Sequence, residues 1–314
     1  GINNGIDLSG EGGMVWCKMR DNTLAYNHNL FDTERGVRKF LESNTTDAEG
    51  TASAGHSLTT FNSNGFTLGT NWNNENRSSS TNVSWTFRKA EKFFDIVQWT
   101  GTQNASTVIN HNVDGEVGMI IVKRTSGTGG WAVYHKSLGT GKYISLDQSY
   151  GSSTDAAFFP SVTSTNFRPG SDGDVNQSGI TMTAWIFASD AGGFGDEDII
   201  KCGSYTGNGS SGNAITLGFE PQWLLWKPSS GTGDWQIVDS MRQWTADGVV
   251  NRLEPNTSDV EATSGTAYCQ LTSTGFTQNG TSSSNNDNGV TYIYMAIRRG
   301  PMKTPTAGTE VFAV

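Results

Sequence analysis

The chain has 314 residues, a formal net charge of −9 and only 16% charged residues, but 39 glycines and ten tryptophans. The acidic balance argues against nucleic acid as the main partner, because phosphate binding requires clustered Lys and Arg side chains. No apolar run has the length needed to cross a bilayer, so we expect a soluble protein without membrane insertion.

The cysteines exclude two further classes of protein. Cys17, Cys202 and Cys269 are odd in number and show no CxxC spacing, which favours neither a disulfide framework nor a zinc site. Cys17 and Cys269 lie within strand-like runs, where we expect buried free thiols.

Short apolar runs, separated by Gly, Asn and Asp, follow one another from the start of the chain. Runs rich in β-branched and aromatic residues between turn residues are typical of strands, and helical periodicity is almost absent. The runs of the first third are 14–18, 37–41, 58–61, 65–68, 83–87 and 93–101. Strong alternation in 83–87, and again in 182–187 and 292–297, predicts one buried face and one face toward solvent or a neighbour.

A hairpin pattern occurs three times along the chain. Residues 223–242 contain an apolar run that ends at Lys227, a Ser-Gly-Thr-Gly turn, and a second run that begins at Trp235. Residues 119–135 repeat this pattern closely and residues 14–35 repeat it loosely. The three run-ending lysines are spaced by about 105 residues, which predicts three copies of one unit of roughly 100 residues.

We therefore predict an all-β protein with repeats at 1–101, 102–207 and 208–308, followed by a C-terminal strand at 309–314. Six or seven short strands per unit fit a β-sandwich, whose two sheets bury their inward faces against each other. A propeller is the alternative architecture, although its blades normally have about 40–50 residues. The last strand has no unit of its own, and we expect it to pair with the first repeat or with a neighbouring subunit.

Two acidic pairs are candidates for chemistry. Asp47 and Glu49 recur as Asp259 and Glu261. Residues two apart on a strand or loop can chelate Ca²⁺, and carboxylate pairs serve glycosidases, but a solvated acidic loop is the simplest interpretation. No other cofactor is expected, and the absence of HExxH, GxSxG and P-loop motifs argues against an enzyme.

Other recurring side chains have structural interpretations. Asp32 and Arg35 recur as Asp239 and Arg242, a spacing that suits a hydrogen-bonded pair at a turn. Among the tryptophans, Trp72 stands in a polar Asn-rich loop and is the best candidate for stacking on a glycan. Trp131 and Trp235 are expected in the core.

Several of these motifs together resemble a family of virion-associated proteins of marine tailed bacteriophages, including phages of cyanobacteria. The resemblance covers essentially the whole chain and rests on the repeated hairpin, on 32–36, 43–46 and 65–69, and on the ending 298–303. It implies a tail fibre, spike or capsid-surface protein with concanavalin-like or jelly-roll-like sandwich units. The implied partners are other virion proteins, sister subunits in a homo-oligomer such as a trimer, and a host-surface glycan. The alternatives are a virion protein without ligand, and a secreted carbohydrate-binding module or depolymerase.

Overall fold

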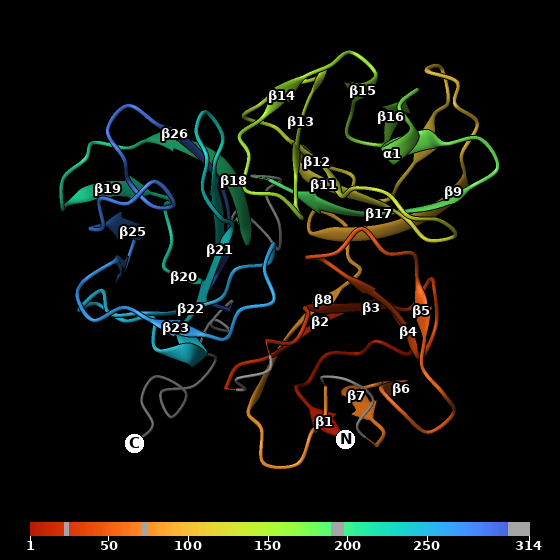
Figure 1. Ribbon diagram of the computed structural model, residues 1–314, viewed down its shortest axis with the longest axis horizontal. Coiled ribbons are helices and arrows are strands. Elements are labelled where there is room, and N and C mark those ends of the chain that lie inside the picture. The colour runs from red at the N-terminus through yellow and green to blue at the C-terminus, as the bar shows by residue number, and fades with distance from the viewer. Residues whose placement is uncertain (22–24, 71–74, 190–197, 301–314) are drawn as a thin grey trace, which may run out of the picture.

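The computed structural model describes residues 1–21, 25–70, 75–189 and 198–300 (Figure 1). Trp72 and the expected strand at 309–314 lie outside these residues. The described part is nearly all β, as predicted, and its sheets are antiparallel. Its regular helices are limited to one turn of α-helix, α1 (Gly173–Asn176), and one 3-10 turn, η1 (Ser240–Arg242).

The first group of strands, group 1, covers residues 2–88 and forms two sheets. The larger has the order β5-β4-β3-β2-β8, and the smaller has the order β1-β7-β6. The strands are β1 (Ile2–Asn3), β2 (Gly13–Met19), β3 (Asn29–Asp32), β4 (Lys39–Glu42), β5 (Gly50–Thr51), β6 (Leu58–Asn62), β7 (Gly65–Leu68) and β8 (Asn82–Arg88).

Group 2 covers residues 94–188 and again contains a large and a small sheet. The orders are β14-β13-β12-β11-β17-β9 and β10-β16-β15. The strands are β9 (Phe94–Thr100), β10 (Ile109–Asn110), β11 (Val117–Arg124), β12 (Ala132–His135), β13 (Lys142–Ser145), β14 (Ser153–Thr154), β15 (Phe158–Val162), β16 (Asn166–Gly170) and β17 (Thr181–Ala188).

Group 3 covers residues 200–298. Its main sheet has the order β18-β26-β20-β21, and it is accompanied by β19-β25-β24 and by the pair β22-β23. The strands are β18 (Ile200–Thr206), β19 (Asn213–Thr216), β20 (Pro221–Pro228), β21 (Gln236–Asp239), β22 (Asn251–Arg252), β23 (Ala262–Thr263), β24 (Cys269–Thr272), β25 (Gly275–Gln278) and β26 (Thr291–Arg298).

The three predicted hairpins are confirmed as β2–β3, β11–β12 and β20–β21. In each group the hairpin's first strand also pairs with the alternating strand that comes last in that group. The three run-ending lysines occupy equivalent positions in these pairings. They lie opposite Val83 of β8, Thr183 of β17 and Ile293 of β26.

Two strands cross from one group to the next. β9 follows β8 in the chain but pairs with β17, and β18 follows β17 but pairs with β26. Each lies just before a predicted repeat boundary, at 101 or 207, and joins the sheet of the following group. The boundaries themselves stay a prediction. Among the described residues β8, by contrast, ends its sheet without a partner on its outer side.

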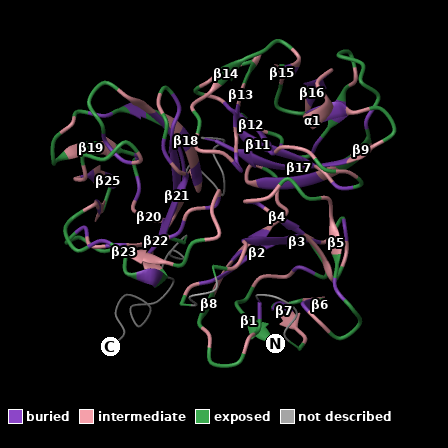
Figure 2. Cartoon of the chain, in the orientation of Figure 1, coloured by how far each residue is buried: buried purple, intermediate pink, exposed green. Residues whose placement is uncertain are grey.

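The first strand of each hairpin is buried on both faces. In β2, Val15 and Cys17 pack with Phe66 in a core beneath the small sheet, while Met14 and Trp16 enter a second core shared by the three groups. Buried residues accordingly line the strands that face the middle of the molecule (Figure 2). In β17 and β26 the second face predicted from the alternation therefore meets a neighbour rather than solvent, whereas in β8 the alternate residues Ser84 and Thr86 are only partly buried.

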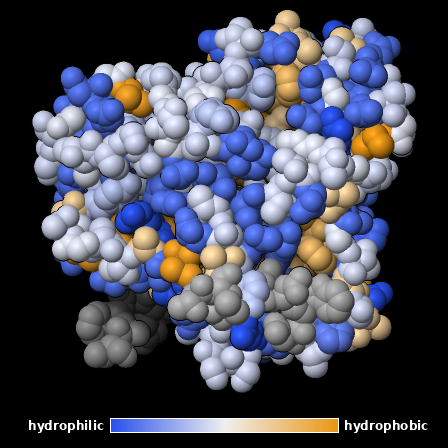
Figure 3. Space-filling view, in the orientation of Figure 1, coloured by the Kyte–Doolittle hydropathy of each residue, from blue (hydrophilic) through white to orange (hydrophobic). Residues whose placement is uncertain are grey.

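The three groups lie around a common centre, with group 3, group 2 and group 1 following one another clockwise in Figure 1. The face seen in Figure 3 is mostly hydrophilic, with small separate apolar patches. Among the described residues no helix has the length and apolar character to cross a membrane.

Candidate functional site

The run-ending lysines are buried where the groups meet. Lys18, Lys123 and Lys227 are at most 1% exposed, and each Nζ donates to a carbonyl in its own hairpin loop, at Tyr26, Gly129 and Gly233 respectively. Burial lowers the pKa of Lys18 and Lys123 to about 8 and that of Lys227 to about 7.

Two of these lysines also bind the neighbouring group. Lys123 Nζ in group 2 donates to the Thr46 carbonyl of group 1 at 3.0 Å, and Lys18 Nζ in group 1 donates to the Ser258 carbonyl of group 3 at 3.1 Å. Thr46 and Ser258 occupy matching places in the two acidic loops.

At the junction between groups 3 and 2, as at that between groups 2 and 1, the hairpin of the later group donates to a carbonyl of the earlier group. There the Gly233 amide donates to the Ser149 carbonyl at 2.9 Å, as the Gly129 amide does to Thr46 at 2.9 Å. Indole N–H groups reinforce both junctions, since Trp131 donates to the Thr45 carbonyl and Trp235 to the Ser145 carbonyl, each at 2.9 Å. The contacts thus run from group 2 to 1, from 3 to 2 and from 1 to 3, which closes a cycle.

The two Asp–Arg pairs are confirmed as buried ion pairs. Arg35 Nε lies 2.6 Å from Asp32 Oδ2, and Arg242 Nε lies 2.6 Å from Asp239 Oδ2. Each arginine also donates to a carbonyl five residues earlier, which fixes the turn after the hairpin. A hydrogen-bonded ion pair of this kind is stabilised because both charges are satisfied inside the protein.

Each pair receives a tryptophan from another group. Trp85 Nε1 of group 1 donates to Asp239 Oδ2 of group 3 at 2.9 Å, and Trp185 Nε1 of group 2 donates to Asp32 Oδ2 of group 1 at 3.2 Å. The Arg242 guanidinium lies 5.2 Å from the Trp85 ring centroid, within cation–π range. We call each Asp–Arg pair together with its tryptophan a clamp, and the two clamps hold neighbouring groups together.

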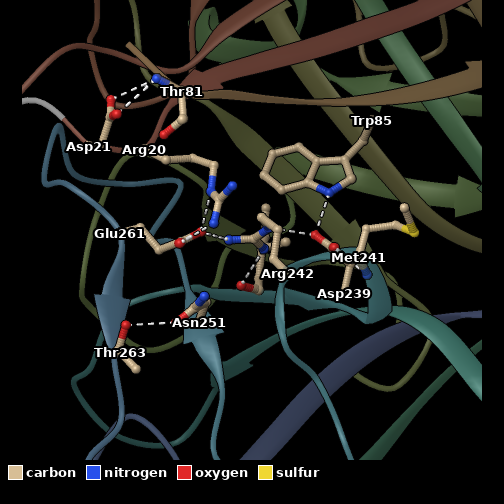
Figure 4. Close-up of polar contacts among 11 residues, drawn as sticks. Arg20, Asp21, Thr81, Trp85, Asp239, Met241, Arg242, Asn251, Glu261 and Thr263 are labelled. Carbon is tan, nitrogen blue, oxygen red and sulfur yellow. Dashed lines mark hydrogen bonds and ion pairs between the residues drawn. The ribbon is translucent and has the colours of Figure 1, made fainter. Parts of the chain in front are cut away.

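The clamp between groups 1 and 3 is extended by a further ion pair (Figure 4). Glu261 Oε2 lies 2.7 Å from Arg242 Nη1, and Glu261 Oε1 lies 2.7 Å from Arg20 Nη2 of group 1. The hydrogen bond with Glu261 raises the pKa of Arg20. Glu261 thus bridges two arginines from different groups.

Group 2 lacks this clamp, as its sequence indicates. His135 occupies the register position of Asp32 and Asp239, and its Nε2 donates to the Tyr294 carbonyl of group 3 at 3.0 Å. Burial lowers the pKa of His135 to about 4, so the ring is neutral at pH 7. A neutral donor to a backbone oxygen replaces the ion pair at this junction.

The acidic pairs divide between ion pairs and surface positions. Glu49 Oε1 lies 3.2 Å from Lys39 Nζ and its Oε2 lies 3.5 Å from Arg35 Nη1, which parallels the two arginines around Glu261. Asp47 and Asp259 are exposed. The residues that could hold calcium thus have basic partners or face solvent, and the described ranges contain no group of three or more His, Cys, Asp or Glu suited to a metal ion. The calcium site stays a prediction.

The exposed aspartates also influence the neighbouring lysines. Burial lowers the pKa of both Lys18 and Lys123. The charge of Asp259 partly offsets this effect at Lys18, and the charges of Asp147, Asp174 and, least, Asp47 partly offset it at Lys123. Each acidic loop therefore supplies negative charge to the adjacent group.

The remaining sequence predictions concern aromatic residues and thiols. Trp131 and Trp235 are buried in the core as predicted, and Cys17, Cys202 and Cys269 are buried free thiols. The glycan-stacking prediction for Trp72 lies outside the described residues.

A pocket of about 430 Å³ lies between groups 1 and 3. Its lining includes β8 on one side and Trp223, Met241 and Ile297 on the other. The lining is mainly apolar, and Met241 is 91% exposed. Asp239, the aspartate of the clamp between groups 1 and 3, is also one of the lining residues.

Sequence reasoning missed the partners of the clamps and this pocket. Alignment of the three copies on their lysines would have placed Trp85 and Trp185 at one position, since both lie two residues beyond the partner of the lysine along the last strand. His28 follows Tyr26 by two residues as Trp131 follows Gly129, and its Nδ1 accepts from Trp16 Nε1 at 3.1 Å. The different loop sequence of the first copy conceals this match.

The fold and the junctions define a β-rich protein in which three groups of sheets are tied together by buried polar contacts. The chain belongs to the family described as a domain of unknown function, DUF7483, whose model matches residues 4–301. Comparisons with curated proteins and with solved structures find no match.

Proposed function

We propose that this protein is a non-enzymatic structural component of a tailed-bacteriophage particle, as a tail fibre, spike or capsid-surface protein. The observation that carries the proposal is the cycle of junction contacts. The recurring charged and indole side chains are the residues most suited to chemistry, and they are bonded between groups, either to one another or to backbone carbonyls. The resemblance of the sequence to virion-associated proteins supports the particle location.

The finer architecture is part of the same proposal. Each group combines a large sheet with a three-stranded sheet over an apolar core, so we interpret the groups as three β-sandwich-like repeats. Three units joined by buried contacts give a rigid body that is suited to an extracellular surface. Its partners are then other virion proteins and further copies of itself in a homo-oligomer, for which a trimer is a natural candidate.

Mass spectrometry of density-purified particles, with immunogold labelling by antibodies against the chain, tests the location. We expect the protein to co-purify with intact particles at a fixed copy number and to be accessible to antibody. Recovery only in the soluble fraction of the lysate would contradict the proposal and favour a secreted binding module or depolymerase. Light scattering of the purified chain gives the oligomeric state.

Host-glycan recognition is the second part of the proposal, and it rests on Trp72 alone. Binding of the labelled protein to intact host cells should weaken at least tenfold in Trp72→Ala, because stacking on a sugar ring requires the indole. Tyr150→Ala is the matched control, since Tyr150 is an aromatic residue with 68% exposure. Equal binding by both variants and the unaltered chain would leave an architectural protein without this ligand site.

A further inference from the structure

The outer edge of β8 is exceptional among the three groups. β17 and β26, the last strands of groups 2 and 3, each have a partner on both sides, but β8 is paired only with β2 among the described residues. An open edge presents unpaired amide and carbonyl groups to any segment that can add a strand.

The hydrogen-bonding pattern shows which groups face this edge. The Lys89 amide donates to the Gly12 carbonyl at 3.0 Å, and the Arg20 amide donates to the Thr81 carbonyl at 2.9 Å. The amide and carbonyl groups of successive residues in an antiparallel strand point to opposite sides. The odd-numbered residues of β8 therefore bond to β2, and the amide and carbonyl groups of its even-numbered residues point away from β2. The amides of Ser84, Thr86 and Arg88 therefore face the open edge.

The pocket of about 430 Å³ lies along this same edge. All six residues from Val83 to Arg88 line it, together with apolar side chains of group 3. Trp223 is among the lining residues, is 4% exposed, and its buried Nε1 has no hydrogen-bond partner within the described ranges. A strand placed here would bring carbonyl acceptors to the open amides of β8 and apolar side chains to the apolar lining of the pocket.

The described chain ends at this pocket, because Gly300 is one of its lining residues. The following sequence contains the apolar run Val311-Phe312-Ala313-Val314. The six residues 309–314 would cover roughly 20 Å as a strand, which is close to the length of the seven-residue β8. The connecting residues 301–308 can span at most roughly 29 Å, so the run starts within reach of the edge.

The connectivity of the other groups sets the precedent. The strand that follows β8 in the chain completes the sheet of group 2, and the strand that follows β17 completes the sheet of group 3. Since the junction contacts close a cycle, the strand that follows β26 is the one left to complete group 1.

We propose that residues 309–314 add to β8 of the same chain as an antiparallel strand and close the three groups into a complete cycle. This inference is independent of the virion location. It assigns the apolar pocket to the chain's own segment rather than to a diffusible ligand.

Hydrogen exchange of the Ser84, Thr86 and Arg88 amides, followed by NMR, tests the proposal. We expect exchange at these amides to accelerate at least tenfold when residues 309–314 are deleted, while odd-numbered amides of β8 change less. Phe312→Asp with Val314→Asp should have the same effect in a chain of full length. Thr304→Asp with Thr306→Asp, which adds equal charge within the connecting residues, should not.

Light scattering on the same samples distinguishes the chain's own strand from that of a second copy. An unchanged mass together with accelerated exchange supports the proposal. Loss of protection only with dissociation of an oligomer would identify a second copy as the donor and overturn it. Equal exchange in the deletion, the double aspartate variant and the unaltered chain would also overturn it.

Discussion

The indole N–H of Trp85 is bonded to the carboxylate of Asp239 at 2.9 Å, although the two residues are 154 positions apart. The same carboxylate oxygen accepts from Arg242 Nε at 2.6 Å. One buried aspartate thus joins the last strand of group 1 to the hairpin of group 3, and the equivalent Asp32 joins groups 1 and 2 through Trp185. Stability of the whole chain should therefore depend on these few contacts.

Trp85→Phe tests the indole bond directly. The variant keeps an aromatic ring in the core but removes the donor, and we expect it to lower the free energy of unfolding by about 2 kcal/mol. Trp99→Phe is a matched control, because the Trp99 Nε1 has no hydrogen-bond partner among the described residues. Urea denaturation of both variants measures the difference, and equal losses would show that ring size rather than the bond is responsible.

Glu261 and Asp259 should differ sharply although they are two residues apart. Glu261→Gln weakens the bridge between Arg20 and the buried Arg242, so we expect a loss of about 1–3 kcal/mol in unfolding free energy. Asp259 is exposed, and Asp259→Asn should change the stability by less than about 0.5 kcal/mol. Similar values for the two variants would contradict a bridging role for Glu261.

Calcium provides an independent test of the acidic pairs. Glu49 and Glu261 each lie beside two basic side chains, and a divalent cation would have to displace these partners. We therefore expect the melting temperature to be equal in EDTA and in millimolar Ca²⁺. A rise of several degrees with Ca²⁺ that is lost in Asp47→Asn or Asp259→Asn would establish the predicted metal site instead.

The sequence allowed the hairpins and most strands to be predicted because their signals are local. Turn residues, alternation and a lysine at the end of an apolar run each lie within a few positions of the element that they specify. The partner of Trp85 could not be predicted, since it depends on how groups 1 and 3 meet. The same holds for β9 and β18, whose sequences are strand-like but do not reveal that they join the following sheet.

The acidic pairs illustrate the same limit within the candidate site. Asp47-x-Glu49 and its copy indicate clustered negative charge, which is compatible with chelation of a cation. The basic residues beside Glu261 come from positions 20 and 242, on two different groups. Local spacing carries no record of such partners, so the sequence alone does not reveal that Glu261 bridges two groups.

The buried lysines should make stability depend on pH. Burial lowers the pKa of Lys227 from 10.5 to about 7, and lowers that of Lys18 and Lys123 to about 8. Between pH 7 and 9 the unfolded chain therefore binds more protons than the folded chain, and the free energy of unfolding rises with pH. Above about pH 9 the buried thiols of Cys17 and Cys269, whose pKa values burial raises, oppose this rise.

Lys227→Met isolates one of these contributions. It keeps an unbranched side chain in the buried site but removes the titrating group, so the gain in unfolding free energy from pH 7 to pH 9 should shrink by about 1–2 kcal/mol. Lys142→Met serves as the control, because Lys142 is exposed on β13 and its removal should leave the slope unchanged. Urea denaturation at pH 7, 8 and 9 gives the slopes. An equal slope in Lys227→Met and the unaltered chain would mean that the buried ammonium keeps an ordinary pKa, held by its carbonyl partner at Gly233.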